Sequence, residues 1–203
     1  MLVLRGGFFR KFAVVSEVHH IMLLVGELIR LRALEPVDLN RLYKWENDTT
    51  IWSVSGTMAP FSRFVLEEFV NQAHQDIYTN KQLRLMIELK YISDHEEIDE
   101  PKAIGCVDLF EFDPRNRRAG LGILIADRAD RGKGYATEAL HLVIEYAFQV
   151  LDLHQLYCNV RIDNESSVAL FKKSGFEISG LKQDWIYENG RYIDEYLLQL
   201  VRK

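Results

Sequence analysis

The feature that most constrains the fold is a loop with two glycines between a strand-like run and a helix-like run. The strand-like run covers residues 121–125 (LGILI), the loop covers residues 131–137 (RGKGYAT), and a helix pattern extends over residues 138–150. The first amides of a helix have no partner within it and lie at the positive end of its dipole, so bare N–H groups at this junction form an anion site. Arg131 and Lys133 add positive charge. The loop therefore predicts a pyrophosphate site and a nucleotide-bearing cofactor.

The loop differs from the two commonest phosphate-binding fingerprints. A Walker loop has four residues between its glycines and then Gly-Lys-Ser/Thr, and a dinucleotide fold has Gly-x-Gly-x-x-Gly after its first strand. Here the order is Arg-x-x-Gly-x-Ala, carried by Arg131, Gly134 and Ala136 late in the chain. A basic turn that only eases the start of a helix is the alternative interpretation.

Composition narrows the class of protein. The 203 residues suit one domain with a substantial core. A net charge of −5 argues against general nucleic-acid binding, and no apolar stretch is long enough to span a membrane. The histidines lack metal-ligand spacing, so no metal site is expected. Cys106 and Cys158 lie in apolar runs, which is typical of buried thiols in a reducing, cytoplasmic compartment.

The first 21 residues have a different character from the rest of the chain. Basic residues precede the apolar run 12–15, but Glu17 soon breaks that run and no clean cleavage site follows, so the pattern of a signal peptide is incomplete. We expect residues 1–21 to be an N-terminal extension without catalytic residues and residues 22–203 to form one domain. A tail that binds a partner is the alternative.

The order of elements predicts a mixed α/β (α+β) domain. Its sheet is mostly antiparallel and twisted, with helices on both faces. The acidic segment 93–101 reads as a hairpin loop, and Asn189-Gly190 is the preferred two-residue hairpin turn. Strand patterns cover residues 28–32, 83–89, 103–112, 119–126, 156–160, 176–187 and 191–200, and helix patterns cover 36–47, 62–78, 138–150 and 164–174.

Single residues mark element boundaries in this prediction. Ser62 is an N-cap candidate, and Gly175 is expected just after the end of a helix. Gly120 and Gly122 within one strand suggest a bulge or a close backbone approach.

Several segments together resemble the GNAT N-acetyltransferase superfamily over roughly residues 28–200. The loop fits its acetyl-coenzyme A motif, Gln/Arg-x-x-Gly-x-Gly/Ala, and residues 117–125 are similar to the strand before it. Residues 163–165 (DNE) and 170–176 (LFKKSGF) resemble the family's Asn-x-x-(Ala/Ser)…Leu-Tyr-x-Lys-x-Gly-Phe segment. The closing residues 187–192 (YENGRY) resemble the spermidine acetyltransferase and ribosomal-protein N-terminal acetyltransferase branches.

The resemblance implies acetyl-coenzyme A as co-substrate and direct attack by a primary amine in a ternary complex. It implies that loop amides hold the pyrophosphate and that strand backbone pairs with the pantetheine arm. A bulge near Gly122 would separate this strand from residues 156–160 and open the slot for the arm. The predicted cofactor-binding residues are Ile123, Leu124, Ile125, Arg131, Gly132, Lys133, Gly134, Tyr135, Ala136, Thr137, Asn164 and Phe171.

The catalytic acid and base are less directly indicated. Phe171 stands where many members have a tyrosine proposed to protonate the thiolate, and phenylalanine has no hydroxyl. By resemblance Ser167 is a candidate proton donor for the thiolate, although a serine at a helix start also bonds locally to backbone. Tyr135 and Tyr157 are further candidate donors. Asp108 is the first candidate base, because its apolar neighbours face the other side of the sheet. Glu111 and Glu195 are the alternative bases, but each is more simply interpreted as an ordinary strand carboxylate in contact with solvent.

The acceptor implied by the resemblance is a polyamine such as spermidine. The acidic patch of that branch is not evident in residues 56–63 (GTMAPFSR), and Gly120 stands where the branch has a carboxylate. A protein N-terminus or another small amine stays open, as does a non-catalytic acyl-coenzyme A-binding module. The resemblance also implies a homo-oligomer.

Overall fold

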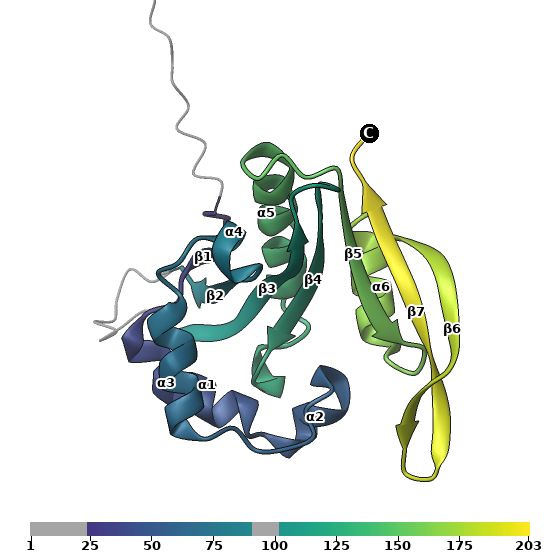
Figure 1. Cartoon of the computed structure of the whole chain (residues 1–203), viewed down its shortest axis with the longest axis horizontal. Coiled ribbons are helices and arrows are strands. Elements are labelled where there is room, and N and C mark those ends of the chain that lie inside the picture. The colour runs from purple at the N-terminus through teal and green to yellow at the C-terminus, as the bar shows by residue number, and fades with distance from the viewer. Residues whose placement is uncertain (1–23, 91–101) are drawn as a thin grey trace, which may run out of the picture.

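The computed structural model describes residues 24–90 and 102–203, which contain a seven-stranded sheet with the order β1-β2-β3-β4-β5-β7-β6. Neighbouring strands are antiparallel except β4 and β5, which are parallel, so the expected mixed sheet is confirmed (Figure 1). The strands are β1 Ile29–Ala33, β2 Leu83–Leu89, β3 Ala103–Asp113, β4 Arg118–Ile125, β5 Gln155–Arg161, β6 Glu177–Glu188 and β7 Arg191–Val201. The helices are α1 Leu39–Glu46, α2 Thr49–Ser55, α3 Arg63–Gln72, α4 Ile77–Asn80, α5 Tyr135–Gln149 and α6 Glu165–Lys173, with short 3-10 turns at Pro36–Asp38 and Arg128–Asp130.

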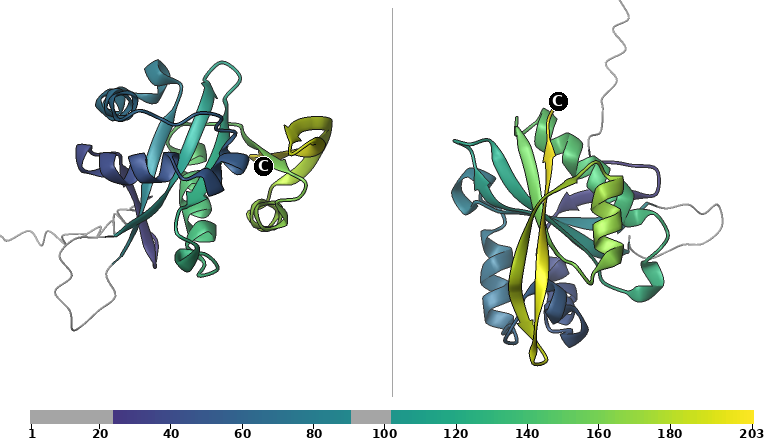
Figure 2. Two further views of the ribbon diagram at one scale, coloured as in Figure 1. Left: turned by 90° about the horizontal axis from the view of Figure 1, so that it is seen from below. Right: turned by 90° about the vertical axis from the view of Figure 1, so that its right-hand side faces the viewer.

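Helices cover both faces of the sheet, α1 and α3 on one and α5 and α6 on the other (Figure 2). The alternation of side chains along β3 produces this arrangement. Val107 and Leu109 are buried in the larger core cluster, which includes α5, while Cys106 belongs to a second cluster with Leu42 of α1 and Val70 of α3.

Four of the described helices, α2, α3, α4 and α6, begin at a side-chain cap. Ser62 accepts from Val65 N at 3.2 Å and so starts α3 as predicted. The predicted helix over 62–78 is wrong in length: α3 ends at Gln72, and Asp76 caps the separate α4 by accepting from Thr79 N at 2.9 Å. The helix α2 was not predicted, although Asp48 caps it by accepting from Thr50 N at 2.9 Å.

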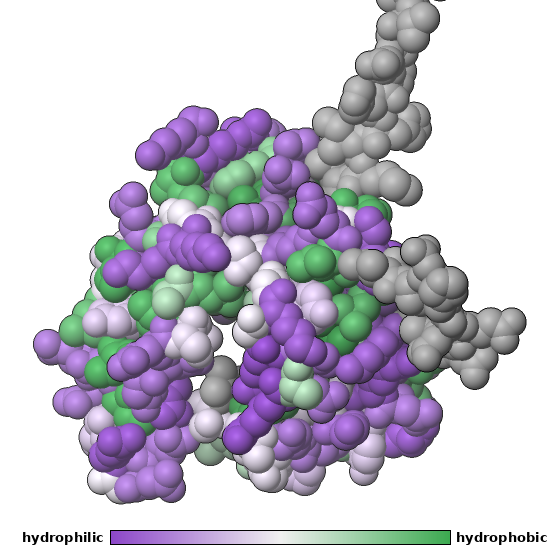
Figure 3. Space-filling model, turned by 180° about the vertical axis from the view of Figure 1, so that it is seen from behind, coloured by the Kyte–Doolittle hydropathy of each residue, from purple (hydrophilic) through white to green (hydrophobic). Residues whose placement is uncertain are grey.

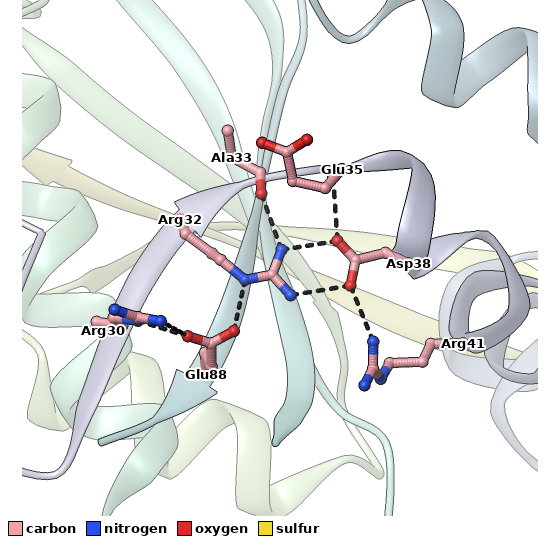
Figure 4. Close-up of polar contacts among 7 residues, drawn as sticks. All are labelled: Arg30, Arg32, Ala33, Glu35, Asp38, Arg41 and Glu88. Carbon is pink, nitrogen blue, oxygen red and sulfur yellow. Dashed lines mark hydrogen bonds and ion pairs between the residues drawn. The ribbon is translucent and has the colours of Figure 1, made fainter. Parts of the chain in front are cut away.

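A network of arginines and buried carboxylates ties β1 and β2 to the start of α1 (Figure 4). Arg32 donates to both oxygens of Asp38, at 2.7 and 2.9 Å, and to Glu88 at 2.6 Å. Arg30 and Arg41 add contacts to Glu88 and Asp38 respectively. Burial alone would raise the pKa of Asp38, but hydrogen bonds from Arg32 and the Glu35 N–H, with the charge of Arg32, outweigh it and lower the pKa below its usual value.

The predicted turn residues are confirmed, but the predicted bulge is not. Asn189 and Gly190 have φ values of 50° and 80°, as the hairpin turn requires, and Gly175 after α6 has φ 92°. The β3–β4 register runs without a shift from Gly105 opposite Ile125 to Phe110 opposite Gly120. The bulge expected near Gly122 is therefore wrong.

The irregularity lies on the partner strand instead. The register shifts between Phe110 and Asp113, where Glu111 has φ 49°. Gly120 serves a close approach, because a Cβ there would clash with the Phe110 ring. The predicted extension 1–21 and loop 93–101 lie outside the described residues. Among the described segments, no helix is long and apolar enough to cross a bilayer.

Candidate active site

A cavity of about 420 Å³ opens where β4 and β5 part. The two strands pair only from Arg118 opposite Gln155 to Gly120 opposite Tyr157, and they diverge beyond that point (Figure 1). The lining residues come from α2, β4, β5, α6 with its N-cap, and the β6–β7 hairpin. Seen from behind, an opening separates the lobe that carries the hairpin from the rest of the molecule (Figure 3).

The diverging strands leave one backbone edge of β4 available. Residues 121–125 pair with β3 on one side, and among the described residues β5 provides no ladder partner for them on the other. An extended arm can add to such an edge through main-chain hydrogen bonds. Of the predicted arm-binding residues, Ile123 lines the cavity, whereas the Leu124 side chain packs toward α1 and α3 and Ile125 is buried.

The predicted pyrophosphate loop starts α5 without a side-chain cap. Gly134 is the N-cap with φ 89°, and within the described residues no side chain bonds to the first amides of this helix. Gly132 has φ 75°, and a Cβ there would meet nothing within 4 Å, so the space above the loop is open. Free helix-start amides beside open space fit an anionic phosphate group.

The two basic residues of the loop have different partners. Arg131 donates to the backbone oxygens of Ile125 at 3.1 Å and Ala126 at 3.2 Å, so its guanidinium holds the loop to the end of β4. Lys133 is half-exposed and lies 3.7 Å from Asp130. The exposed ammonium is therefore the charge that an anion above the loop would meet.

Helix α6 and its N-cap residue bring three predicted residues to the cavity. The Asn164 side-chain oxygen accepts from Ser167 N at 3.2 Å and from Ser166 Oγ at 3.0 Å, so Asn164 is the N-cap. Asn164, Ser167 and Phe171 all line the cavity. Phe171 is buried and packs edge-on against Phe176 with ring centroids 5.1 Å apart.

A family model for the acetyltransferase (GNAT) domain matches residues 29–177. The chain belongs to the GNAT acetyltransferase family. It is 32% identical to the spermidine N(1)-acetyltransferase of Vibrio cholerae, over 84% of this chain and 93% of that protein. It is 30% identical to the enzyme of the same name from Escherichia coli K12, over 81% of each chain. A crystal structure of the Vibrio cholerae enzyme in complex with CoA and spermine matches with a TM-score of 0.74 and 29% identity, covering 85% of this chain and 95% of that one.

This GNAT protein is therefore an acetyl-CoA-dependent N-acetyltransferase. The open loop at the start of α5, the free edge of β4 and the cavity between β4 and β5 fit the anionic, extended shape of that co-substrate. Of the predicted cofactor residues, Ile123, Asn164 and Phe171 line the cavity, whereas residues 131–137 are not among its lining residues.

The candidate base of this acetyltransferase is held in an ion pair. Both oxygens of Asp108 accept from Arg84, at 2.8 and 3.1 Å, and Arg84 also contacts Glu46 at 2.5 Å. Asp108 pairs across the strands with Gly122, which lines the cavity, but Asp108 itself is not among the lining residues. The structure therefore separates Asp108 from the cavity by its partner strand.

Of the two alternative carboxylates, only Glu195 lines the cavity. Glu111 accepts from the Tyr157 hydroxyl in a second hollow of about 360 Å³, at the end where β4 and β5 are still paired. The Tyr157 hydroxyl, a candidate proton donor from the sequence, therefore bonds to Glu111 outside the lining of the cavity.

Both cysteines are free and buried, as predicted. Cys158 lines the cavity, but burial raises the pKa of its thiol to about 12. Burial likewise raises the pKa of Cys106 to about 12. A thiol with so high a pKa is a poor nucleophile near neutral pH.

Sequence reasoning missed the contacts that join α2 to the β6–β7 hairpin beside the cavity. Arg161 donates to the Ser53 backbone oxygen at 3.0 Å and to Glu188 at 2.8 Å, and so links α2 to the hairpin. It also pairs with Asp163 at 2.9 Å. The Asp48-x-Thr50 pattern was the available signal for α2, but nothing local indicates its contact with Arg161.

Proposed function

We propose that the chain transfers an acetyl group from acetyl-CoA to a primary amine of a polyamine such as spermidine, by direct attack in a ternary complex. The observation that carries the proposal is the cavity between β4 and β5, whose lining combines the predicted cofactor residues Ile123 and Asn164 with Glu195 and Trp185. A carboxylate and an aromatic face attract cations. The names of the relatives, and the neighbour complexed with CoA and spermine, support this acceptor.

Backbone groups of the chain would hold acetyl-CoA, the acetyl donor. Amides of residues 132–137, with the Lys133 ammonium, would bind the pyrophosphate. The free edge of Ile123–Ile125 would pair with the pantetheine arm. The oxygen of Asn164 is engaged in the cap, so its side-chain NH₂ is the group left to donate to the cofactor. When bound, acetyl-CoA supplies an acyl carbon activated as a thioester.

The chain must also take a proton from the amine and return one to the thiolate. Ser167 lines the cavity and has a hydroxyl, so it stays the candidate acid. Asp108 stays the candidate base; since it is paired with Arg84 and does not line the cavity, it would reach the amine only through intervening water past Gly122, which has no side chain. Phe171 contributes an apolar wall to the cavity.

The assembly and the domain limits belong to the same proposal. A dodecameric structure of the Vibrio cholerae enzyme matches with a TM-score of 0.68 and 28% identity. We place the catalytic domain in residues 22–203 and expect it to act as a homo-oligomer.

Thiol release from acetyl-CoA tests the function. Spermidine should give release well above a no-acceptor control, and a peptide with a free N-terminus should give little. Release with the peptide alone would assign a protein N-terminal acetyltransferase. Tight acetyl-CoA binding without release for any amine would assign a non-catalytic acyl-CoA-binding module.

A further inference from the structure

One lysine ammonium is held against the cavity wall by three lining residues. Lys182 Nζ donates to Glu195 Oε2 at 2.8 Å and to Asn159 Oδ1 at 2.8 Å, and it lies 4.8 Å from the centroid of the Trp185 ring. Glu195, Asn159 and Trp185 all line the cavity. They come from β7, β5 and β6, so the position is built by three strands.

These three groups match the needs of a primary ammonium. An ammonium has three donors and one charge, and here it meets a carboxylate, a neutral amide oxygen and an aromatic face. The lysine side chain is an alkylammonium on a four-carbon stem. A polyamine arm is also an alkylammonium, so the position that receives Lys182 suits such an arm equally well.

A bulge in β6 brings Lys182 and Trp185 to the same face of the strand. Residues three apart on a regular strand face opposite sides of the sheet, yet Lys182 and Trp185 meet at one point. The β6–β7 register shifts between Lys182 and Ile186, and Asp184 there has φ 51°. The Asp184 N–H donates to Asp194 Oδ1 at 2.8 Å, which fixes the bulge. Bulges commonly re-aim a side chain in this way.

We infer that Lys182 occupies the subsite for a non-reacting ammonium of the acceptor, and that a polyamine must displace it in order to bind. The inference rests on the proposed function. The lysine can leave, because its side chain is 28% exposed on the edge strand, whereas Glu195 is 14% exposed and stays in the wall. A monoamine has no second cation to place there, so it binds with the lysine still in position. Lys182 therefore lowers the apparent affinity only for acceptors with more than one positive charge.

The test compares Lys182→Met with wild type by steady-state kinetics on spermidine and on a monoamine of similar length. Removing the internal competitor should lower the KM for spermidine about fivefold, the factor by which a competing, partly exposed ion pair of ordinary strength weakens apparent affinity. The ratio of monoamine KM to spermidine KM should rise by a similar factor. Glu195→Gln should raise the spermidine KM about tenfold, because it removes the charge of the subsite.

Lys81→Met is the matched control. Its ammonium also lies over an aromatic ring, 6.0 Å from the Phe112 centroid, but Lys81 is not among the residues that line the cavity. Its spermidine KM should equal that of wild type. Thermal unfolding of each variant separates loss of fold from loss of binding, and Lys182→Gln, which keeps a hydrogen-bonding group without the charge, replaces Lys182→Met if the latter unfolds.

The outcomes separate the two claims. An unchanged or higher spermidine KM in the folded Lys182 variant overturns the inference and leaves the proposed function standing. Equal KM changes for spermidine and the monoamine also overturn it, since the effect would not depend on a second charge. If wild type does not acetylate spermidine, the proposed function fails and the inference fails with it.

Discussion

The helices that follow β4 and β5 begin in opposite ways. Asn164 caps α6 with its side-chain oxygen, whereas α5 begins at Gly134 without any side-chain cap among the described residues. A helix start has unpaired amides that need a partner. In α6 the chain supplies that partner itself, and in α5 the described residues supply no side-chain partner. The proposed pyrophosphate site requires this difference, because an anion can bind only amides that no cap occupies.

The acidic residue in the first turn of α5 agrees with this view. Glu138 does not turn back to its own helix start, because its carboxylate accepts from Leu28 N at 3.0 Å and Ile29 N at 3.0 Å. Its charge thus anchors the segment that enters β1. The amides of the preceding loop stay available to an anion.

Gly134→Val, at the uncapped start of α5, should have the largest effect on acetyl-CoA binding. A side chain at the approach to the loop amides should weaken acetyl-CoA binding about 100-fold, which corresponds to the loss of about two charge-assisted hydrogen bonds. Isothermal titration with acetyl-CoA measures the change. Gly190→Val is the matched control, because Gly190 also has positive φ and open space but lies in the hairpin turn. Equal affinities in the two variants would rule out the loop as the pyrophosphate site.

Two substitutions of Asn164 separate its two roles. Asn164→Asp keeps the cap but removes the NH₂ donor, so the KM for acetyl-CoA should rise about tenfold while the melting temperature holds. Asn164→Ala removes both, so it should also lower the unfolding free energy by about 1 kcal/mol. If the aspartate variant binds acetyl-CoA like wild type, Asn164 serves the helix alone.

Phe171→Tyr tests whether the α6 side of the cavity lacks an acid. The new hydroxyl could protonate the thiolate, so kcat should rise severalfold, below the factor of about 100 or more that a well-placed general acid contributes. Steady-state kinetics with spermidine gives the value, and Phe176→Tyr in the same aromatic pair is the control. A collapse in kcat would show that the buried ring is needed for packing.

Substitution of Asp163 should have the smallest effect, and it should change only the free energy of unfolding. The Arg161 hydrogen bond lowers the pKa of this largely exposed carboxyl just before the cap of α6. A lowered folded-state pKa contributes stability above the unfolded value of about 3.9, and that contribution is lost as pH falls through the folded value. Asp163→Asn should therefore cost less than about 1 kcal/mol at pH 7 and nothing near pH 2. Urea unfolding at both pH values checks this, and a constant difference would contradict it.

Local patterns predicted most elements but not their irregular parts. Ser62, Gly175 and Asn189-Gly190 were placed correctly because each acts through backbone geometry within a few residues. The bulge at Glu111 was missed, since a register shift depends on the partner strand. The short helix α2 escaped detection because its contact with Arg161 joins residues 108 positions apart.

The features of the candidate site likewise separate into those that depend on local sequence and those that depend on tertiary structure. The sequence alone determined the anion loop, the strand before it and the helix cap, because these depend on glycine, amide and capping chemistry close together in the chain. Only the tertiary structure decided that β4 and β5 part beyond Gly120, that Arg84 holds Asp108, and that Lys182 meets side chains from three strands. Those outcomes depend on which side chains from distant segments reach the same point, and that is set by strand register and packing.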